Sequence, residues 1–420
     1  MRELTDEMVI DHCPPAPKPP APHDITIPGR HVAEIAKHPD GRLAVISWSS
    51  PKIDPGLLNP ALHVIENGRI TDLGATPADA GSPVWWGDEI YYLALTPPHL
   101  QGGNAVFDQR HRNLTPGMPA CPAELVQDDG NAPIMIVAAG LDTEFHRLGG
   151  GLLARITGAH RPRGGRADEL GDIPWGVQER LRYQAQDGLD LDGLLVLPVG
   201  KTRADGPFPL ITLVHGGPYD RWADDFQLHW VPSAQWFAHQ GFASFLPNPR
   251  GSLGRGHEFA AAVSRRVGQE EWHDIEAGID LLIHQGIANP DRLGISGWSH
   301  GGFMAAWATT RTDRFKAALV GAGISDWPEL IAHGEWGAFE AALGDGPEHS
   351  PITYADRIRT PLLIVHGADD TNVPVEQAEL LHRAVQTSEL KIYPGEGHSL
   401  RTREHRLDLL NRARRFFAKL

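Results

Sequence analysis

The sequence is poor in cysteine, and this limits how the fold is stabilised. Only Cys13 and Cys121 occur among 420 residues, so a framework of several disulfides, of the kind that small secreted domains use, is excluded. One disulfide between the two is an alternative, but two free thiols are favoured. Residues 1–7 are acidic and have no apolar core, unlike a signal peptide. These features together predict a cytoplasmic protein.

Long apolar runs and an excess of positive charge are also missing. No stretch approaches the roughly 18–20 apolar residues that span a bilayer, so no membrane partner is expected. The chain has 38 Lys and Arg against 53 Asp and Glu, a net charge of −15. This balance argues against a nucleic-acid-binding surface, which needs clustered positive charge. One small basic cluster, formed by Arg161, Arg163 and Arg166, is interpreted as part of a solvated linker.

Motifs that hold metals or nucleotides are absent as well. No His-Glu-x-x-His or similar zinc spacing occurs. The glycines of residues 251–256 loosely match a nucleotide-binding loop, but the fingerprint's acidic residue about 20 positions later is lacking. The sequence therefore predicts neither a metal site nor a cofactor.

The most informative stretch that is present is Gly297-Trp298-Ser299-His300-Gly301. It follows a short apolar run and precedes an alanine-rich, helical run at 302–309. This strand–turn–helix context is the one that a Gly-x-Ser-x-Gly nucleophile elbow requires. The turn is so tight that positions two before and two after the serine favour glycine. The alternative is an ordinary glycine-rich loop between a strand and a helix.

Two downstream loops supply partners that could activate Ser299. The apolar strand 361–367 is followed at once by Asp369 and Asp370, and a short strand at 390–393 precedes His398 in a glycine-flanked loop. A serine nucleophile needs a base, and the base needs a carboxylate that fixes its tautomer. The order Ser, Asp, His is that of α/β-hydrolases. With 22 histidines in the chain, His398 is singled out by its position alone.

An upstream turn predicts where a developing oxyanion is held. The apolar strand 210–214 is followed by His215-Gly216-Gly217-Pro218. A glycine here lets a backbone N–H point at the oxyanion without steric cost, and each such donor contributes about 3 kcal/mol. The predicted donors are the N–H groups of Gly217 and of His300, the residue after the nucleophile. A plain turn is the alternative interpretation.

Taken together, five motifs resemble the prolyl oligopeptidase family of serine peptidases, and most closely its acylaminoacyl-peptidase and dipeptidyl-aminopeptidase-like branch. The resemblance covers residues 175–420 and implies cleavage of short peptides, often near a blocked or free N-terminus. The motifs are His215-Gly216-Gly217-Pro218, Asn248-Pro249-Arg250-Gly251-Ser252, Gly297-Trp298-Ser299-His300-Gly301-Gly302, His366-Gly367-Ala368-Asp369-Asp370 with Val373-Pro374, and Gly397-His398.

The resemblance also implies roles for individual residues. It makes Asp370, and not its neighbour Asp369, the acid of the triad. Candidates for substrate contact are His215, Arg250 and Trp336. For Arg250 a structural ion pair is an equally good interpretation, and for Trp336 buried packing is favoured. A further carboxylate, Glu335, is a candidate for sensing a substrate amine, although a solvated surface residue is the favoured interpretation.

The N-terminal part of the chain is predicted to contain β-structure only. Residues 1–29 are proline-rich and expected to be extended, packed on the catalytic domain as in the related enzymes. Residues 30–158 contain turns at 38–41, 86–88 and 128–131, each within a unit of 40–45 residues and four strands, the period of a propeller blade. The predicted fourth strands are 70–74, 112–117 and 154–158. Closed propellers have four to eight blades, whereas this chain has room for three.

A partial propeller has consequences for assembly and for substrate access. Its open strand edges would invite pairing, so we expect them to be covered by the catalytic domain, by the N-terminal segment or by a second subunit. Residues 159–174 are interpreted as a linker. From 175 to 420 strands and helices alternate, which predicts an α/β fold with a mostly parallel, doubly wound sheet. Predicted helices include 233–240, 271–284 and 404–420.

Three functions are compatible with these observations. The first is a serine hydrolase that cleaves peptide or amide bonds of short peptides or of acylated or aminoacyl substrates. The second is an esterase, amidase or acyltransferase that acts on a small metabolite, since an open propeller does not select substrates by size. The third is a binding protein without catalysis. The first two share one triad, so the motifs do not separate them.

Overall fold

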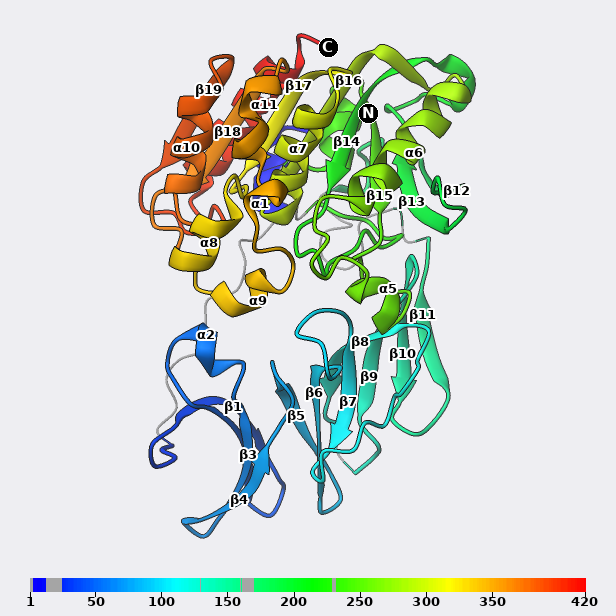
Figure 1. Cartoon of the computed structure of the whole chain (residues 1–420). Helices are drawn as coiled ribbons and strands as arrows, with labels where there is room; N and C mark the ends of the chain where they lie inside the picture. Colours follow the sequence, from blue (N-terminus) through cyan, green and yellow to red (C-terminus); the bar gives the residue numbers. More distant parts are fainter. Residues whose placement is uncertain (1–2, 13–24, 129, 159, 161–169, 229–231) are drawn as a thin grey trace.

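A computed structural model describes residues 3–12, 25–128, 130–158, 160, 170–228 and 232–420 (Figure 1). Three small antiparallel sheets lie in the lower half of the view, and a large sheet covered by helices lies in the upper half. Cys13, the cluster Arg161, Arg163 and Arg166, and most of the predicted linker lie outside the described residues. The predicted domain boundaries at 29, 158 and 174 stay predictions.

The upper region confirms the predicted α/β fold. Its eight-stranded sheet has the order β12-β13-β15-β14-β16-β17-β18-β19. The strands from β14 to β19 run parallel, while β12 and β13 pair in antiparallel fashion at one edge. The strands are β12 (Gln178–Gln184), β13 (Asp190–Val196), β14 (Phe208–Val214), β15 (Ala243–Asn248), β16 (Ala288–Trp298), β17 (Phe315–Gly321), β18 (Leu362–Gly367) and β19 (Ser388–Tyr393).

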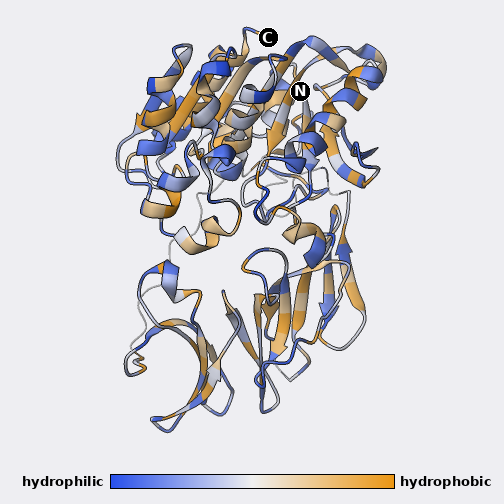
Figure 2. Ribbon diagram, in the orientation of Figure 1, coloured by the Kyte–Doolittle hydropathy of each residue, from blue (hydrophilic) through white to orange (hydrophobic). Residues whose placement is uncertain are grey.

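Helices cover both faces of this sheet, as a mostly parallel sheet requires. One hydrophobic cluster lies against α6 and α7, and a second lies against α4 and α11. Hydrophobic residues dominate the strands, whereas the helices carry hydrophilic residues as well (Figure 2). The helices are α4 (Ala234–His239), α5 (His257–Ala261), α6 (Glu270–His284), α7 (His300–Arg311), α8 (Trp327–His333), α9 (Gly337–Ala341), α10 (Glu376–Ala384) and α11 (Arg403–Phe417), with 3-10 turns at Arg203–Asp205, Pro347–His349 and Pro351–Arg357.

The N-terminal segment differs from the prediction in its local structure. Part of the segment predicted to be extended, Asp6–His12, forms the helix α1, because Val9 and Ile10 pack on an apolar surface in the second cluster. Asp6 accepts a hydrogen bond of 2.9 Å from Trp236 Nε1, and Asp11 pairs with Arg403 at 2.8 Å. The segment therefore packs on the catalytic region as expected. None of the helices in the described residues is long and apolar enough to cross a membrane.

The lower region confirms three blade-like sheets in a partial propeller. A short helix, α2 (Ile53–Gly56), interrupts the first sheet. The first sheet holds β1 (His31–Lys37), β2 (Leu43–Trp48), β3 (Ala61–Glu66) and β4 (Arg69–Ala75); the second holds β5 (Gly81–Trp86), β6 (Glu89–Leu95) and β7 (Asn104–Asp108); the third holds β8 (Cys121–Val126), β9 (Ile134–Ala139), β10 (Asp142–Arg147) and β11 (Leu152–Ile156). Cys121 is buried as a free thiol.

The predicted fourth strand of the second sheet, 112–117, is wrong. In this segment side-chain oxygens accept hydrogen bonds from backbone N–H groups, and no continuous strand pairing forms. The carboxylate of Asp108 accepts the N–H groups of Arg110 and Arg112, which turns the chain, and Thr115 Oγ1 accepts the N–H of Val106 at 3.0 Å. Asx turns of this kind compete with strand pairing. Only an isolated bridge from Phe107 to Asn113 remains.

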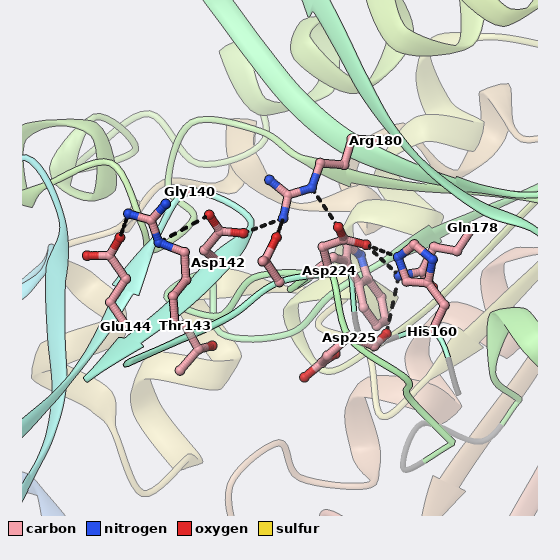
Figure 3. A network of polar contacts seen from close by, with 12 residues as sticks. Gly140, Asp142, Thr143, Glu144, His160, Gln178, Arg180, Asp224 and Asp225 are labelled. Carbon is pink, nitrogen blue, oxygen red and sulfur yellow. Dashed lines mark hydrogen bonds and ion pairs between the residues drawn. The ribbon is translucent and has the colours of Figure 1, made fainter. Parts of the chain in front are cut away.

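A buried polar network joins the third sheet to the catalytic region (Figure 3). Asp224, whose side chain is 3% exposed, accepts hydrogen bonds from Arg180 at 2.6 Å and Gln178 at 2.9 Å, and lies 2.6 Å from His160 Nε2. The same arginine also pairs with Asp142 on β10. Because Arg180 lies on β12, the network ties the edge of the large sheet to the last blade.

Within this chain, one outer edge of the blade row stays exposed. Hydrophobic clusters join the first sheet to the second and the second to the third. The catalytic region meets the first sheet at α2, where Asp54 accepts the N–H of Ala338 at 2.7 Å. Yet Leu152 and Leu153 on the last strand are 49% and 48% exposed. A second subunit over these edges stays a prediction.

Candidate active site

Ser299 occupies a strained turn between β16 and α7, as the elbow motif predicts. Its φ is 57° and its ψ is −122°, which non-glycine residues rarely adopt. Neighbouring glycines make the turn feasible. A Cβ on Gly297 would lie 2.3 Å from the carbonyl of Gly301, and one on Gly301 would lie 2.2 Å from the carbonyl oxygen of Val214. The motif is therefore a close-packed elbow and not an ordinary loop.

Gly301→Ala tests this packing. The added methyl group would meet backbone atoms that have no room to move, so we expect a loss of about 3 kcal/mol in the free energy of unfolding. Urea denaturation measures it. The matched control is Gly151→Ala, where nothing lies within 4 Å and φ is not positive. Equal stability of the two variants would show that the elbow is loosely packed.

Asp370 and His398 meet as predicted. His398 Nδ1 lies 2.8 Å from Asp370 Oδ2, and the two side chains are 25% and 0% exposed. The other carboxylate oxygen accepts the N–H groups of Asn372 and Val373, each at 3.0 Å. Burial alone would raise the pKa of Asp370, but hydrogen bonds from His366 and His398 outweigh it and lower this pKa to about 2. The carboxylate is thus ionised throughout the neutral range.

The neighbouring Asp369 has a different environment. It is exposed, and its N–H donates to the carbonyl of Glu396 at 2.8 Å. Sequence reasoning missed the second imidazole at the acid, since His366 Nε2 lies 3.2 Å from Asp370 Oδ2 and is fully buried. His366 belongs to the motif at residues 366–370. Nothing in that motif indicated that its side chain contacts the carboxylate of Asp370 rather than only packing within the strand.

The loop of His398 is held against the elbow. Trp298 Nε1 donates a hydrogen bond of 2.7 Å to the carbonyl oxygen of His398, so the residue before the nucleophile fixes the histidine loop. Among the described residues no hydrogen bond joins Ser299 Oγ to the imidazole. Such catalytic bonds are often long in unliganded enzymes and tighten with substrate.

Of the two predicted oxyanion donors, one shares a cavity with Ser299 and the other follows it in the sequence. Gly217 has a φ of 110° and lines the same cavity as Ser299. His300 begins α7, where the N–H has no intrahelical acceptor. Its imidazole is turned away from the cavity, because Nε2 is bound to the buried carboxylate of Glu271 at 2.8 Å. Nothing in the sequence indicated that His300 and Glu271 form a pair.

A cavity of about 360 Å³ opens next to Ser299, between the two regions of the chain. Trp336, a predicted substrate contact, lines it. The sheets contribute Asp79, Leu95, Gly102 and Asn104, and the catalytic region contributes Gly217, Tyr219, Leu253, Ser299, Ile324, Trp336, Phe339, Glu340 and Asn372. Its size suits a short peptide or a small acyl or amide compound.

His215 and Arg250 do not line this cavity, contrary to their prediction as substrate contacts. His215 is 2% exposed, and its Nε2 lies 2.8 Å from Ser252 Oγ. Arg250 Nη2 pairs with the buried carboxylate of Asp274 at 2.7 Å, and Nη1 pairs with Asp187 at 2.8 Å. Both side chains therefore stabilise the loops around the site, and the structural ion pair is the correct interpretation of Arg250.

Two carboxyl groups at the cavity were missed. Glu335, the predicted amine sensor, is exposed and outside the lining, whereas Glu340 lies within it, together with Asp79. Burial raises the pKa of Glu340 to about 8. Asp79 is exposed, but partial removal of water by the surrounding protein and, after it, the charge of Glu34 raise its pKa to about 6. In the described part of the chain no group of three or more His, Cys, Asp or Glu is arranged to hold a metal ion.

Comparison with known proteins finds one family that part of the catalytic region resembles. Residues 229–420 match the model of the "Prolyl oligopeptidase family". The chain is 33% identical over 244 residues to an uncharacterized peptidase, YuxL, of Bacillus subtilis, covering 54% of this chain and 36% of that protein. It is 32% identical over 216 residues to dipeptidyl aminopeptidase BIII of Pseudoxanthomonas mexicana, covering 47% and 31%.

Solved structures agree on the fold. The acylaminoacyl peptidase of Pyrococcus horikoshii superposes with a TM-score of 0.80 at 21% identity, covering 92% of this chain and 70% of that one. The similarity thus extends to the partial propeller, although identity at this level shows the fold alone. The chain spans about a third of the length of the two curated relatives.

Proposed function

We propose that the catalytic region is a serine peptidase of the prolyl oligopeptidase family, whose model residues 229–420 match, and that the protein hydrolyses peptide or amide bonds of short peptides or of acylated or aminoacyl compounds. One observation carries the proposal. The strained Ser299, at the end of β16, shares a cavity with Gly217, while the adjacent loop presents a His398 already bound to an ionised Asp370 at 2.8 Å.

The proposed reaction has two halves. Ser299 Oγ attacks the carbonyl carbon as His398 takes its proton, and the N–H groups of Gly217 and His300 stabilise the oxyanion. His398 then gives the proton to the leaving amine, which leaves an acyl-enzyme. In the second half water attacks the acyl group with the same histidine as base, and Ser299 is released. Asp370 fixes the imidazole and stabilises its positive charge.

A panel of substrates tests the proposal. Aminoacyl-, acyl-aminoacyl- and dipeptidyl-nitroanilides are compared with nitrophenyl esters under one set of conditions. Hydrolysis of at least one class of anilide is the expected result, since an oxyanion site and a general acid are needed for an amine leaving group. If the protein hydrolysed the esters but none of the anilides, that result would contradict peptidase activity.

The alternative of an esterase, amidase or acyltransferase has one observation in its favour. The second of three sheets and its loops line the cavity, and these sheets form a row rather than a closed ring, so small metabolites have access to it without selection by size. A protein that binds without catalysis is the third alternative, and it would be favoured if no member of the panel were turned over.

We propose in addition that the protein is located in the cytoplasm and that a second subunit covers the exposed blade edges.

A further inference from the structure

The first turn of α7 carries a predicted oxyanion donor but lacks the usual side-chain cap. Ser299 occupies the N-cap position, where a serine side chain normally accepts an N–H group of the first helical turn. In the described part of the chain it makes no such bond, since the hydroxyl of a nucleophile has to stay free for attack. The backbone N–H of His300, which begins the helix, therefore needs an anchor from elsewhere.

A buried carboxylate in the first turn of α6 provides this anchor. Glu271 Oε1 lies 2.8 Å from His300 Nε2, and the two residues are 2% and 3% exposed. Because a carboxylate only accepts hydrogen bonds, Nε2 is the donor. Hydrogen bonds to a charged acceptor are among the strongest in proteins, and burial keeps water from competing for this one. The pair therefore joins the first turn of α6 to the first residue of α7.

The second carboxylate oxygen fixes Glu271 itself. Its Oε2 accepts the N–H of Gly268 at 2.6 Å. Gly268 has a φ of 79°, and a Cβ there would lie 3.0 Å from ring atoms of Phe303 and Trp307 on α7. The turn that precedes α6 is thus packed directly on α7. With both oxygens engaged, the carboxylate has little freedom to move away from α7.

Each residue of the elbow has its own tether. Trp298 is held by its indole bond to the carbonyl oxygen of His398, and the N–H of Ser299 donates to the carbonyl oxygen of Gly321 at 2.8 Å. For His300 the tether is the imidazole. Its Nδ1 has no hydrogen-bond partner among the described residues, so the bond of Nε2 is the only one that this side chain makes there. Without the carboxylate, the residue after the nucleophile would lose its tether.

We propose that Glu271 is a positioning residue of the active site, which holds the backbone N–H of His300 in line with the developing oxyanion by way of the imidazole. The inference rests on the proposed function, since that function assigns this N–H to the oxyanion. An oxyanion donor acts at the geometry of the transition state, and a misplacement of about 1 Å costs on the order of 100-fold in rate. Loss of Glu271 should therefore lower kcat and leave KM nearly unchanged.

Kinetics of Glu271→Gln test the proposal. Glutamine keeps the size of the side chain, but its single oxygen cannot accept both the Nε2–H of His300 and the N–H of Gly268. We expect kcat on the best substrate of the panel to fall at least tenfold, with KM within twofold of wild type. A boronic acid analogue of that substrate, which forms a tetrahedral adduct with Ser299, should bind at least tenfold more weakly.

The matched control is Glu270→Gln, one position earlier. Glu270 pairs with Arg266, whose side chain is 58% exposed, and it has no contact with the elbow among the described residues. This substitution should leave kcat within twofold of wild type. An unchanged kcat in Glu271→Gln, or a loss that appears in KM alone, would overturn the proposal.

Substitutions of His300 separate positioning from general destabilisation, because every variant keeps the backbone N–H. His300→Gln retains a side-chain NH₂ group that can donate to the carboxylate, whereas His300→Ala retains none. We expect kcat of His300→Gln to be at least fivefold above that of His300→Ala. Adding Glu271→Gln to His300→Ala should cost less than a further twofold, since the contact is already gone. Equal kcat values for the two single variants of His300, or losses that multiply in the double variant, would contradict the proposal.

Hydrogen exchange tests the tether without any substrate. The first intrahelical bond of α7 runs from the N–H of Phe303 to the carbonyl oxygen of Ser299 at 2.9 Å. Deuterium uptake by a peptide that covers residues 298–304 should be faster in Glu271→Gln than in wild type and in Glu270→Gln, because the first turn opens more often. Equal uptake in all three proteins would contradict the proposal. This measurement gives an answer even if no member of the panel is hydrolysed, a result that counts against the proposed function alone.

Discussion

Ser299→Ala is expected to lower kcat by a factor on the order of 10⁶, the largest effect of any single substitution in this chain. The reason is that the acyl-enzyme forms on Ser299 Oγ alone, and no other hydroxyl lies on the elbow. Steady-state kinetics on the best substrate of the panel measure the effect. Residual hydrolysis would come only from the oxyanion donors and from substrate binding.

The folded state of this variant should be intact. Ser299 Oγ makes no hydrogen bond with the described residues, so its removal leaves no partner unsatisfied. The melting temperature is therefore expected to match that of the wild type. A purified, folded Ser299→Ala protein that keeps more than a hundredth of the wild-type kcat would refute the assignment of the nucleophile.

Asp370→Asn is expected to lower kcat about 10⁴-fold. The amide keeps the shape of the carboxylate, but it carries no negative charge, and its NH₂ group would face His398 Nδ1 and favour the wrong tautomer. The adjacent Asp369→Asn is the control, because Asp369 is exposed and contacts the site only through its backbone.

The two variants together decide which acid serves the triad. We expect kcat to fall in Asp370→Asn and to stay within twofold of wild type in Asp369→Asn. The reverse pattern would show that the resemblance assigned the wrong residue. Because the pKa of Asp370 is lowered to about 2, its protonation should not limit activity at neutral pH; its contribution to stability is lost only as pH falls from about 4 toward 2.

The elements that sequence reasoning predicted correctly depend on local backbone requirements. The elbow around Ser299 needs glycines at 297 and 301 because backbone atoms, of Gly301 for the first and of Val214 for the second, occupy the space of a side chain. Strand–loop–helix alternation likewise predicted the loops of Asp370 and His398, since the carboxyl ends of parallel strands meet at one edge of the sheet. Constraints of this kind are visible in the residues themselves.

What the sequence did not predict depends on distant contacts. The segment Asp6–His12 is a helix because of an apolar surface more than 200 residues away, and Arg250 is held by Asp274 rather than by substrate. Glu340 looked no different from Glu335, although only Glu340 lies in the cavity. For Glu340 the difference arises from the packing of α9 against α2, and contacts of this kind are not encoded in periodicity or motifs.

Covalent labelling with a fluorophosphonate tests the central claim most directly. The probe reacts with a serine hydroxyl only where a base and oxyanion donors activate it. Peptide mapping of the labelled protein should find a single adduct, on the peptide that contains Ser299, and none in the Ser299→Ala variant. An adduct on another residue, or no adduct on folded wild-type protein, would contradict the account.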